Sequence, residues 1–267
     1  MIPKKIHYCW FGRGEKSKLT ERCIKSWKKY CVDYEIIEWN EDNFDINIHP
    51  YTKYCYENKK WAFLSDYVRL WVVEKYGGLY FDTDVEVIKS FDELLQYDGF
   101  YGFENPNYVA SGLEFGSIAH HITVRKMLEK YDELVLKNEE VKLTGCPLLN
   151  TEALLPLGLK LTGKKQVIEG TKILPSEYLN PLEDSTGIVR KTENTLSIHW
   201  YAKSALDKNT ILRSKLTRPM HRLFGKNCFS FLKRILHRYG NDECLKGQHY
   251  LQKVGMLHGE RKIEKVF

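Results

Sequence analysis

A predicted helix that runs straight into a buried strand restricts the fold of this chain more than any other feature. Residues 59–76 place apolar side chains at helical spacing, and Gly77-Gly78 supply the helix stop. The apolar segment 79–81 follows without a loop and predicts a strand. Residues 6–11 and 34–39 also predict strands, with a helix over 17–30 between them. Strands and helices that alternate in this way predict an α/β fold with mostly parallel strands.

The remaining elements extend this pattern toward the C-terminus. Residues 99–104, 112–117 and 195–200 predict strands, residues 122–136 a helix, and residues 144–155 a loop that enters another helix. After residue 200 the chain becomes basic, and Pro219 stands at a suitable first helical position. Apolar residues then follow at positions 220, 223, 224, 231, 232, 235, 236 and 239, which predicts an amphipathic helix.

Length and composition indicate a folded protein with one large domain. The chain has 267 residues, of which 43% are hydrophobic, enough for a substantial core. It has no apolar run of about 18 residues and no signal-peptide pattern, so we expect a cytoplasmic protein. Its seven cysteines lack C-x-x-C spacing, which favours reduced thiols over disulfides or a zinc site.

The positive charge of the chain is concentrated near its C-terminus. The net charge is +6, but residues 203–238 contain ten Lys or Arg and one acid, so this segment carries +9 and the rest −3. We therefore divide the chain into a near-neutral domain over 1–206 and a basic helical extension over 207–267. Three interpretations of the extension stay open: packing against the domain, docking to an anionic membrane, or, least favoured, binding nucleic acid.

Two carboxylates separated by one residue follow the predicted strand 79–81. In an extended segment Asp82 and Asp84, which flank Thr83, point to the same side. Two hard oxygen donors at a strand end suit Mg²⁺ or Mn²⁺. The triplet alone is weak evidence, because D-x-D arises by chance about once in a chain of this length.

Other side chains extend this candidate site, each with an ordinary structural alternative. Asp66 and Arg69 share a helix face and form either a solvated ion pair or a site for ribose, sugar hydroxyls and phosphate. Trp10 follows the first strand, where it either stacks on a nucleobase or packs as an ordinary aromatic residue. His199 is either a third metal ligand or an ordinary buried histidine.

Two more residues complete the sequence-level candidates. Lys203 and Ser204 follow the late strand in a segment suited to phosphate oxygens. His7, by contrast, is interpreted as structural.

Taken in order, four segments of this chain resemble the family 32 glycosyltransferases. They are IHYCWFG, WAFLSDYVRLWVVEKYGGLYFDTDVEV, LPSEYLNPL and SIHWYAKS, and together they span roughly residues 1–206. The family includes bacterial sugar transferases of capsule and lipopolysaccharide synthesis and is related to yeast initiating mannosyltransferases and, more distantly, to clostridial glucosylating toxins. The most specific part of the resemblance is the predicted helix with the pattern S-D-x-x-R, which leads into the pattern G-G-x-Y-x-D-x-D.

The resemblance implies a GT-A fold, a divalent cation, a nucleotide-sugar donor, with UDP favoured over GDP, and retention of anomeric configuration. It implies that Trp10 stacks on the base, that Asp66, Arg69 and Tyr80 hold the ribose and donor sugar, and that Asp82 faces the donor and a metal-bound water. Asp84 is then the direct metal ligand, and His199 a metal or diphosphate contact. The chain departs from the family at Ala205, where related chains often have a tryptophan.

We therefore predict a metal-dependent retaining glycosyltransferase that uses Mn²⁺ or Mg²⁺ and adds a hexose to a surface polysaccharide or a lipid-linked saccharide. Asp82, Asp84 and Arg69 are the predicted catalytic residues, and Glu104 and Glu114 are candidate nucleophiles only through their place in the inferred fold. Two other functions stay open, a metal-dependent phosphotransferase or phosphodiesterase and a non-catalytic membrane- or polysaccharide-binding module. We expect no nucleic-acid partner, and attachment to the inner face of the plasma membrane through residues 203–238 stays open.

Overall fold

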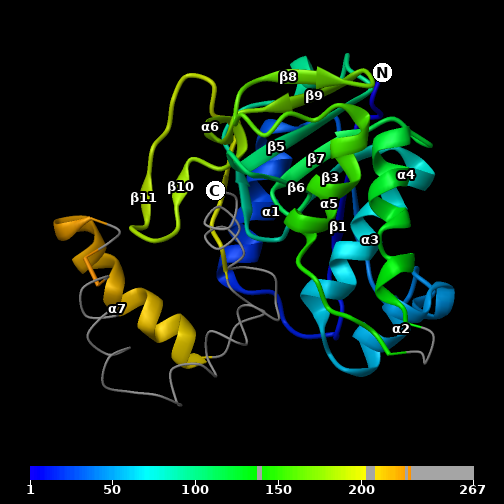
Figure 1. Cartoon of the computed structure of the whole chain (residues 1–267), viewed down its shortest axis with the longest axis horizontal. Coiled ribbons are helices and arrows are strands. Elements are labelled where there is room, and N and C mark those ends of the chain that lie inside the picture. Colours follow the sequence, from blue (N-terminus) through cyan, green and yellow to red (C-terminus); the bar gives the residue numbers. More distant parts are fainter. Residues whose placement is uncertain (137–139, 203–207, 226–227, 230–267) are drawn as a thin grey trace, which may run out of the picture.

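The computed structural model describes residues 1–136, 140–202, 208–225 and 228–229, and its centre is a mixed sheet of eight strands (Figure 1). The strand order is β2-β1-β3-β7-β5-β9-β8, and β6 pairs with β5. The strands are β1 (Lys5–Cys9), β2 (Glu35–Trp39), β3 (Gly78–Phe81), β5 (Gly99–Asn105), β6 (Tyr108–Ala110), β7 (Glu114–Ser117), β8 (Gln166–Ile168) and β9 (Thr171–Leu174).

The N-terminal half of the sheet has the parallel arrangement that the sequence predicts. β1 pairs in parallel with β2 on one side and β3 on the other, and β5 pairs in parallel with β9. β7 lies between β3 and β5 and is antiparallel to both. This arrangement confirms the α/β class, and it places the carboxyl ends of β1 and β3 at the same edge of the sheet.

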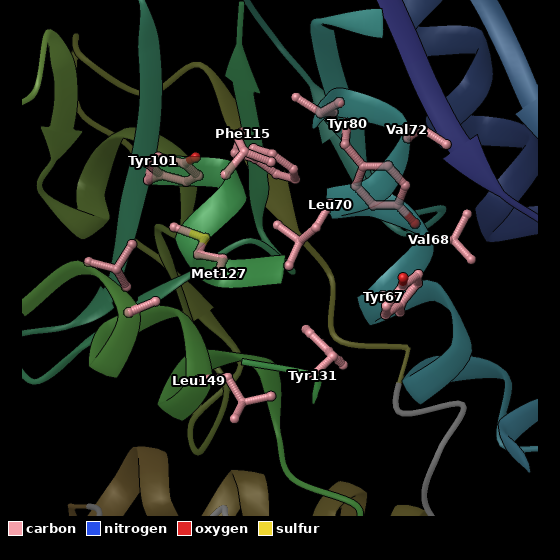
Figure 2. Packing of buried hydrophobic residues seen from close by; sticks show 14 of the residues in the cluster. Tyr67, Val68, Leu70, Val72, Tyr80, Tyr101, Phe115, Met127, Tyr131 and Leu149 are labelled. Carbon is pink, nitrogen blue, oxygen red and sulfur yellow. The ribbon is translucent and has the colours of Figure 1, made fainter. Parts of the chain in front are cut away.

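Helices cover the two faces of the sheet and enclose two cores. α1 (Lys18–Tyr30) contributes Trp27 to one core, while α2 (Pro50–Glu57), α3 (Trp61–Tyr76), α4 (Ile122–Glu129) and α5 (Cys146–Leu154) surround the other. Figure 2 shows side chains of α3, α4 and α5 meeting Tyr80, Tyr101 and Phe115 of the sheet in this second core. Burial of many large apolar side chains, each worth about 1.5–3 kcal/mol, fixes α3 against the sheet.

The α3–β3 junction depends on two glycines and a buried histidine. Gly77 and Gly78 have φ of +62° and +107°, and a Cβ on Gly78 would lie 2.9 Å from the Lys5 carbonyl oxygen. The fully buried His7 accepts a hydrogen bond from the Trp39 indole at Nδ1 and contacts the Gly77 carbonyl through Nε2. Burial lowers the pKa of His7 to about 4, which keeps the ring neutral. The geometry gives His7 the structural role that the sequence predicts.

A second, two-stranded sheet joins distant parts of the chain. β4 (Val85–Val87) pairs antiparallel with β12 (Ser197–His199), so the segment after residue 196 lies beside the segment that follows β3. A short helix, α6 (Ser176–Leu179), and a hairpin of β10 (Leu182–Glu183) and β11 (Ile188–Val189) precede β12.

The helix boundaries correct two predictions. The helix predicted over 122–136 ends at Glu129 and is followed by a short 3₁₀ turn at Asp132–Leu134. The C-terminal helix α7 spans Lys208–Phe224, so Pro219 lies inside it rather than at its start. A proline inside a helix removes one backbone donor and crowds the carbonyl four residues earlier, so α7 contains Pro219 at the cost of one hydrogen bond. The positions predicted for this helix from 231 onward lie outside the described residues.

α7 contacts the β10–β11 hairpin and lies away from the large sheet in Figure 1. Within the described parts of the chain, every helix is too short or too polar to cross a membrane. The proposed division at residue 206 stays a prediction.

Candidate functional site

The two aspartates after β3 lie in a turn, not in the extended segment that the sequence analysis assumed. Asp82, Thr83 and Asp84 connect β3 to β4, and the Val85 N–H donates to the Asp82 carbonyl oxygen at 3.0 Å. The strand pleat therefore does not bring the two carboxylates together. A tight turn does so, because it reverses the chain within four residues.

His199 reaches this turn through the pairing of β12 with β4. Its Nε2 lies 3.1 Å from Asp84 Oδ1, and the Ala202 N–H donates to Asp84 Oδ2 at 2.7 Å. The Trp200 N–H also donates to the backbone carbonyl of Asp84, at 3.0 Å. Residues more than a hundred positions apart thus form one site, as the resemblance to the sugar transferases implied for His199.

Opposite charges determine the protonation of Asp84 and His199. Burial alone would raise the pKa of Asp84, but the adjacent His199 and the Ala202 N–H outweigh burial and lower that pKa to about 2. Burial would likewise lower the pKa of His199, yet the Asp84 carboxylate raises it to about 9. The pair is therefore an imidazolium next to a carboxylate at neutral pH.

Arg69 joins the α3 helix to the aspartate turn. Its Nη2 lies 2.9 Å from Asp66 Oδ1 and 3.0 Å from Asp82 Oδ1, and its Nε donates to the Ser65 carbonyl at 3.1 Å. Arg69 is only 2% exposed, which excludes the solvated ion pair that the spacing alone allowed. Its other terminal nitrogen, Nη1, has no hydrogen-bond partner among the described residues. A buried guanidinium with one free donor is well suited to a polar ligand.

The two aspartates beside Arg69, Asp66 and Asp82, both have raised pKa values. Burial and the neighbouring Asp84 charge together raise the pKa of Asp82 to about 6, against the lowering effect of Arg69. Burial also raises the pKa of Asp66, although Arg69 opposes that shift. Three carboxylates near one guanidinium and one imidazolium form a site that favours additional positive charge.

The space next to the free Arg69 donor is bounded by two residues that the sequence analysis did not select. A Cβ on Gly112 would lie 2.9 Å from Arg69 Nη1, 3.4 Å from Cys146 Sγ and 3.6 Å from Asp82 Oδ2. The buried Cys146 thiol also lies close enough to Asp66 to lower the pKa of that carboxyl. Only a residue without a side chain leaves this space open. No local pattern in the sequence reveals it, because the loop, α3 and α5 meet only in the fold.

Tyr80 lies beneath the guanidinium. Its ring centroid is 5.0 Å from Arg69 Cζ, and the residue is 1% exposed. Tyr80 thus supports Arg69 from the core side of the sheet.

Two glutamates reach the site from neighbouring strands. Glu114 at the start of β7 is fully buried, and neither of its carboxylate oxygens has a hydrogen-bond partner among the described residues. Burial raises its pKa well above the usual range, and the Asp82 and Asp84 charges add to this effect. Burial also raises the pKa of Glu104 on β5, although the positive charge of His199 opposes that shift. Both glutamates therefore lie within electrostatic reach of His199, as their predicted place in the fold required.

Trp10 lies at the same sheet edge as Asp82, one residue beyond the end of β1. Its indole N–H donates to the Gly14 carbonyl at 2.7 Å, and Lys16 Nζ lies 5.5 Å from its ring centroid. The ring is half-buried, so part of it remains available for contact. Lys203, Ser204 and the departure at Ala205 lie outside the described residues.

The donor atoms of Asp82, Asp84 and His199 form a group that fits a divalent cation. One ligand atom from each residue lies within 4.8 Å of the other two. Two carboxylates and a neutral imidazole suit Mn²⁺, and carboxylates also suit Mg²⁺. Because only a deprotonated imidazole nitrogen can bind a metal, His199 would lose its proton when the cation binds. The buried His199 Nδ1 has no hydrogen-bond partner in the described part of the chain, so the ring is not fixed in place on that side.

Comparison with known proteins agrees with this geometry. Residues 17–101, which include α3 and the aspartate turn, match the model of a glycosyltransferase sugar-binding region containing a DXD motif. This part of the chain is therefore similar to the sugar-binding region of DXD-containing glycosyltransferases. The mixed α/β sheet, in which β3 leads into the turn of Asp82 and Asp84, is compatible with the GT-A organisation that the sequence resemblance implied.

Curated proteins with similar sequences include yeast mannosyltransferases. Inositol phosphoceramide mannosyltransferase 2 of Schizosaccharomyces pombe is 29% identical over 52% of this chain and 39% of its own length. Inositol phosphoceramide mannosyltransferase 3 of the same yeast is 27% identical over 42% of this chain and 32% of its own length. Mannosyl phosphorylinositol ceramide synthase SUR1 of Saccharomyces cerevisiae is 27% identical over 50% of this chain and 36% of its own length. The chain thus spans less than two fifths of these relatives.

Two solved glycosyltransferase structures are also similar. The PaToxG glycosyltransferase has a TM-score of 0.43 at 18% identity, covering 58% of this chain and 68% of that chain. A glycosyltransferase involved in glycosylation of the major capsid of PBCV-1 has a TM-score of 0.45 at 10% identity, covering 79% of this chain and 98% of that chain.

Proposed function

We propose that this chain is a metal-dependent retaining glycosyltransferase that moves a hexose from a nucleoside diphosphate sugar onto a saccharide or lipid-linked acceptor. One observation carries the proposal. The buried Asp66–Arg69–Asp82 ion pairs meet the Asp84–His199 pair at one turn, and Arg69 keeps a free donor there. A solvated helix face needs no such arrangement, whereas a sugar diphosphate requires donors, acceptors and a cation close together.

Each residue of the site has a distinct proposed role. Asp84, Asp82 and His199 would hold Mn²⁺ or Mg²⁺, which as a Lewis acid neutralises charge on a leaving diphosphate. Arg69 donates through Nη1 to a donor-sugar hydroxyl or phosphate oxygen, and Asp66 and Asp82 fix the guanidinium plane. Trp10, at the same sheet edge, offers a ring face to the base, and Lys203 and Ser204 stay proposed phosphate contacts.

The buried glutamates bear on the stereochemical course. Retention requires either attack on the same face as the departing diphosphate or a covalent intermediate on a carboxylate. Glu104 and Glu114 both have raised pKa values because of burial, and this reduces the fraction of ionised carboxylate available as a nucleophile. We therefore favour same-face attack by the acceptor hydroxyl over a covalent glutamyl intermediate.

The donor and acceptor are narrower parts of the proposal. The names of the curated relatives support mannose as one hexose to test and a glycosylated or phosphorylated lipid as one acceptor. The resemblance to bacterial sugar transferases instead supports UDP-linked hexoses and surface polysaccharide. A donor panel with both nucleotides separates these cases.

The test is release of nucleoside diphosphate from a panel of UDP- and GDP-hexoses in the presence of Mn²⁺, with water as the acceptor. We expect one donor to be hydrolysed and Asp84→Asn to lose about 100-fold or more of that rate. Asp33→Asn is the matched control, because Asp33 forms only an exposed ion pair with Lys4. Wild-type protein that binds neither nucleotide and releases nothing from any donor would contradict the proposal.

The alternative of a two-metal phosphodiesterase or phosphotransferase lacks support in the described residues. Such enzymes need additional ligands for a second cation, and the described chain has one cluster of this kind, Asp82, Asp84 and His199. A non-catalytic binding module would not explain why Arg69 is buried between two carboxylates or why its Nη1 lacks a partner among the described residues.

A further inference from the structure

α7 exposes a continuous apolar stripe on one face. Leu212, Leu216, Met220, Leu223 and Phe224 recur every three or four residues, which places them along one side of the helix. Their exposed fractions range from 40% for Met220 to 76% for Leu223. Exposed apolar residues of soluble proteins usually occur singly. Five of them along one side of one helix therefore indicate a contact surface.

The opposite side of α7 is held to the protein. The Arg218 guanidinium donates to the Asp184 carbonyl at 3.1 Å and to its carboxylate at 2.9 Å. The Arg222 guanidinium donates to the carbonyls of Thr186 and Gly187 at 2.6 Å and 3.2 Å. These bonds fix α7 on the β10–β11 hairpin with its apolar stripe turned away from the hairpin.

The chain beyond α7 leaves the stripe open as far as the structure describes it. Gly225, with φ of +80°, ends the helix, and the Phe229 ring packs edge-on against His221 at 5.2 Å. His221 lies outside the positions of the stripe. Among the described residues, nothing covers Leu212, Leu216 or Leu223.

The charge of the helix identifies the partner class. Over residues 208–224 the sequence contains five Lys or Arg and no Asp or Glu. Arg218 and Arg222 bind the hairpin, and the other three cations are Lys208, Arg213 and Lys215. A second copy of this helix would bring two such net positive charges together, whereas an anionic bilayer attracts a helix of net positive charge and accepts its apolar side chains at the level of the headgroups. This combination favours lipid over a protein partner.

We propose that α7 docks the protein on anionic membranes, with the stripe of Leu212, Leu216, Met220, Leu223 and Phe224 inserted at the level of the headgroups. This inference does not depend on glycosyl transfer, because it rests on a helix that contributes no residue to the site at Asp84. It assigns to the described part of residues 203–238 the membrane alternative that the sequence left open.

The test is co-sedimentation of the full chain with phosphatidylcholine vesicles that contain increasing fractions of phosphatidylglycerol, without donor or metal. We expect bound protein to rise steeply with the anionic fraction and to fall at high salt. The double variant Leu216→Ser/Leu223→Ser should weaken the vesicle partition coefficient by about tenfold or more, since it removes two inserted side chains.

Val32→Ser and Val167→Ser are matched controls, because both valines are highly exposed but lie far from α7 in sequence. They should bind vesicles like the wild type. Equal binding to neutral and anionic vesicles, or wild-type binding by Leu216→Ser/Leu223→Ser, would overturn the inference. A wild-type dimer in light scattering that becomes a monomer in that double variant, without vesicle binding, would overturn it in favour of self-association. Because no donor is present, these outcomes are separate from those for glycosyl transfer.

Discussion

Arg69 is the residue on which the candidate site depends most. A fully buried guanidinium is costly unless its donors are satisfied, and here Asp66, Asp82 and Ser65 satisfy all of them except Nη1. Burial lowers the pKa of Arg69, but the two carboxylates outweigh burial and raise that pKa well above its usual range. The charge is therefore fixed, and only the space beside Nη1 is left for a ligand.

The substitution Gly112→Ala tests whether a ligand uses the space beside Arg69 Nη1. We expect Gly112→Ala to lower kcat/KM for the donor by about tenfold or more, because its Cβ would lie 2.9 Å from Arg69 Nη1 and would displace the guanidinium. Steady-state donor hydrolysis measures the effect. Gly14→Ala is the control, since a Cβ there meets no atom within 4 Å. Donor kinetics of Gly112→Ala within twofold of the wild type would show that no ligand uses this space.

Helices and strands that depend on local sequence patterns were predicted correctly from the sequence. Helix α3, the glycine stop and strands β1, β2 and β3 follow from apolar spacing and glycine conformation, and all are present within a few residues of their predicted bounds. The prediction that Asp82–Asp84 is extended was wrong, because an Asp-Thr-Asp triplet after a strand is equally compatible with a turn. What pairs with β4 lies more than a hundred residues away, and periodicity carries no information on such partners.

The same limit applies to the candidate site. The sequence analysis selected four site residues that are close in sequence, Asp66, Arg69, Asp82 and Asp84. Gly112 and Cys146 became visible only when loops from different elements met. Pro219 shows the reverse error, since a residue suited to a helix start was tolerated inside α7.

The α3–β3 junction gives a prediction about stability at this scale. Gly78→Ala should lower the free energy of unfolding by several kcal/mol, because it combines a strained φ of +107° with a Cβ 2.9 Å from the Lys5 carbonyl of β1. Gly158→Ala is the matched control. Its φ of +98° is equally strained but its Cβ meets nothing within 4 Å, so it should cost about 1 kcal/mol. Urea unfolding of both variants measures the difference, and equal losses would show that backbone strain alone matters at Gly78.

Across the whole molecule, the site joins α3 and the turn after β3 to the end of β12, which lies more than a hundred residues further along the chain. A ligand that binds this site binds only the folded chain, and it stabilises the fold by about 2.7 kcal/mol at 100 times its dissociation constant. For a chain of this size we expect UDP or GDP with Mn²⁺ to raise Tm by about 5 °C or more. Comparison of the two nucleotides at equal concentration identifies the preferred base.

Asp84→Asn should abolish most of that rise in Tm, because it removes the carboxylate that lies 3.1 Å from His199 and belongs to the cation group. Differential scanning fluorimetry with Mn²⁺ alone, nucleotide alone and both together separates the contribution of each ligand. Asp33→Asn, which changes only an exposed ion pair, should keep the wild-type shift. A full shift in Asp84→Asn would place nucleotide binding elsewhere on the molecule, since a cation held by Asp82 and His199 alone lacks the second carboxylate needed to bridge a diphosphate.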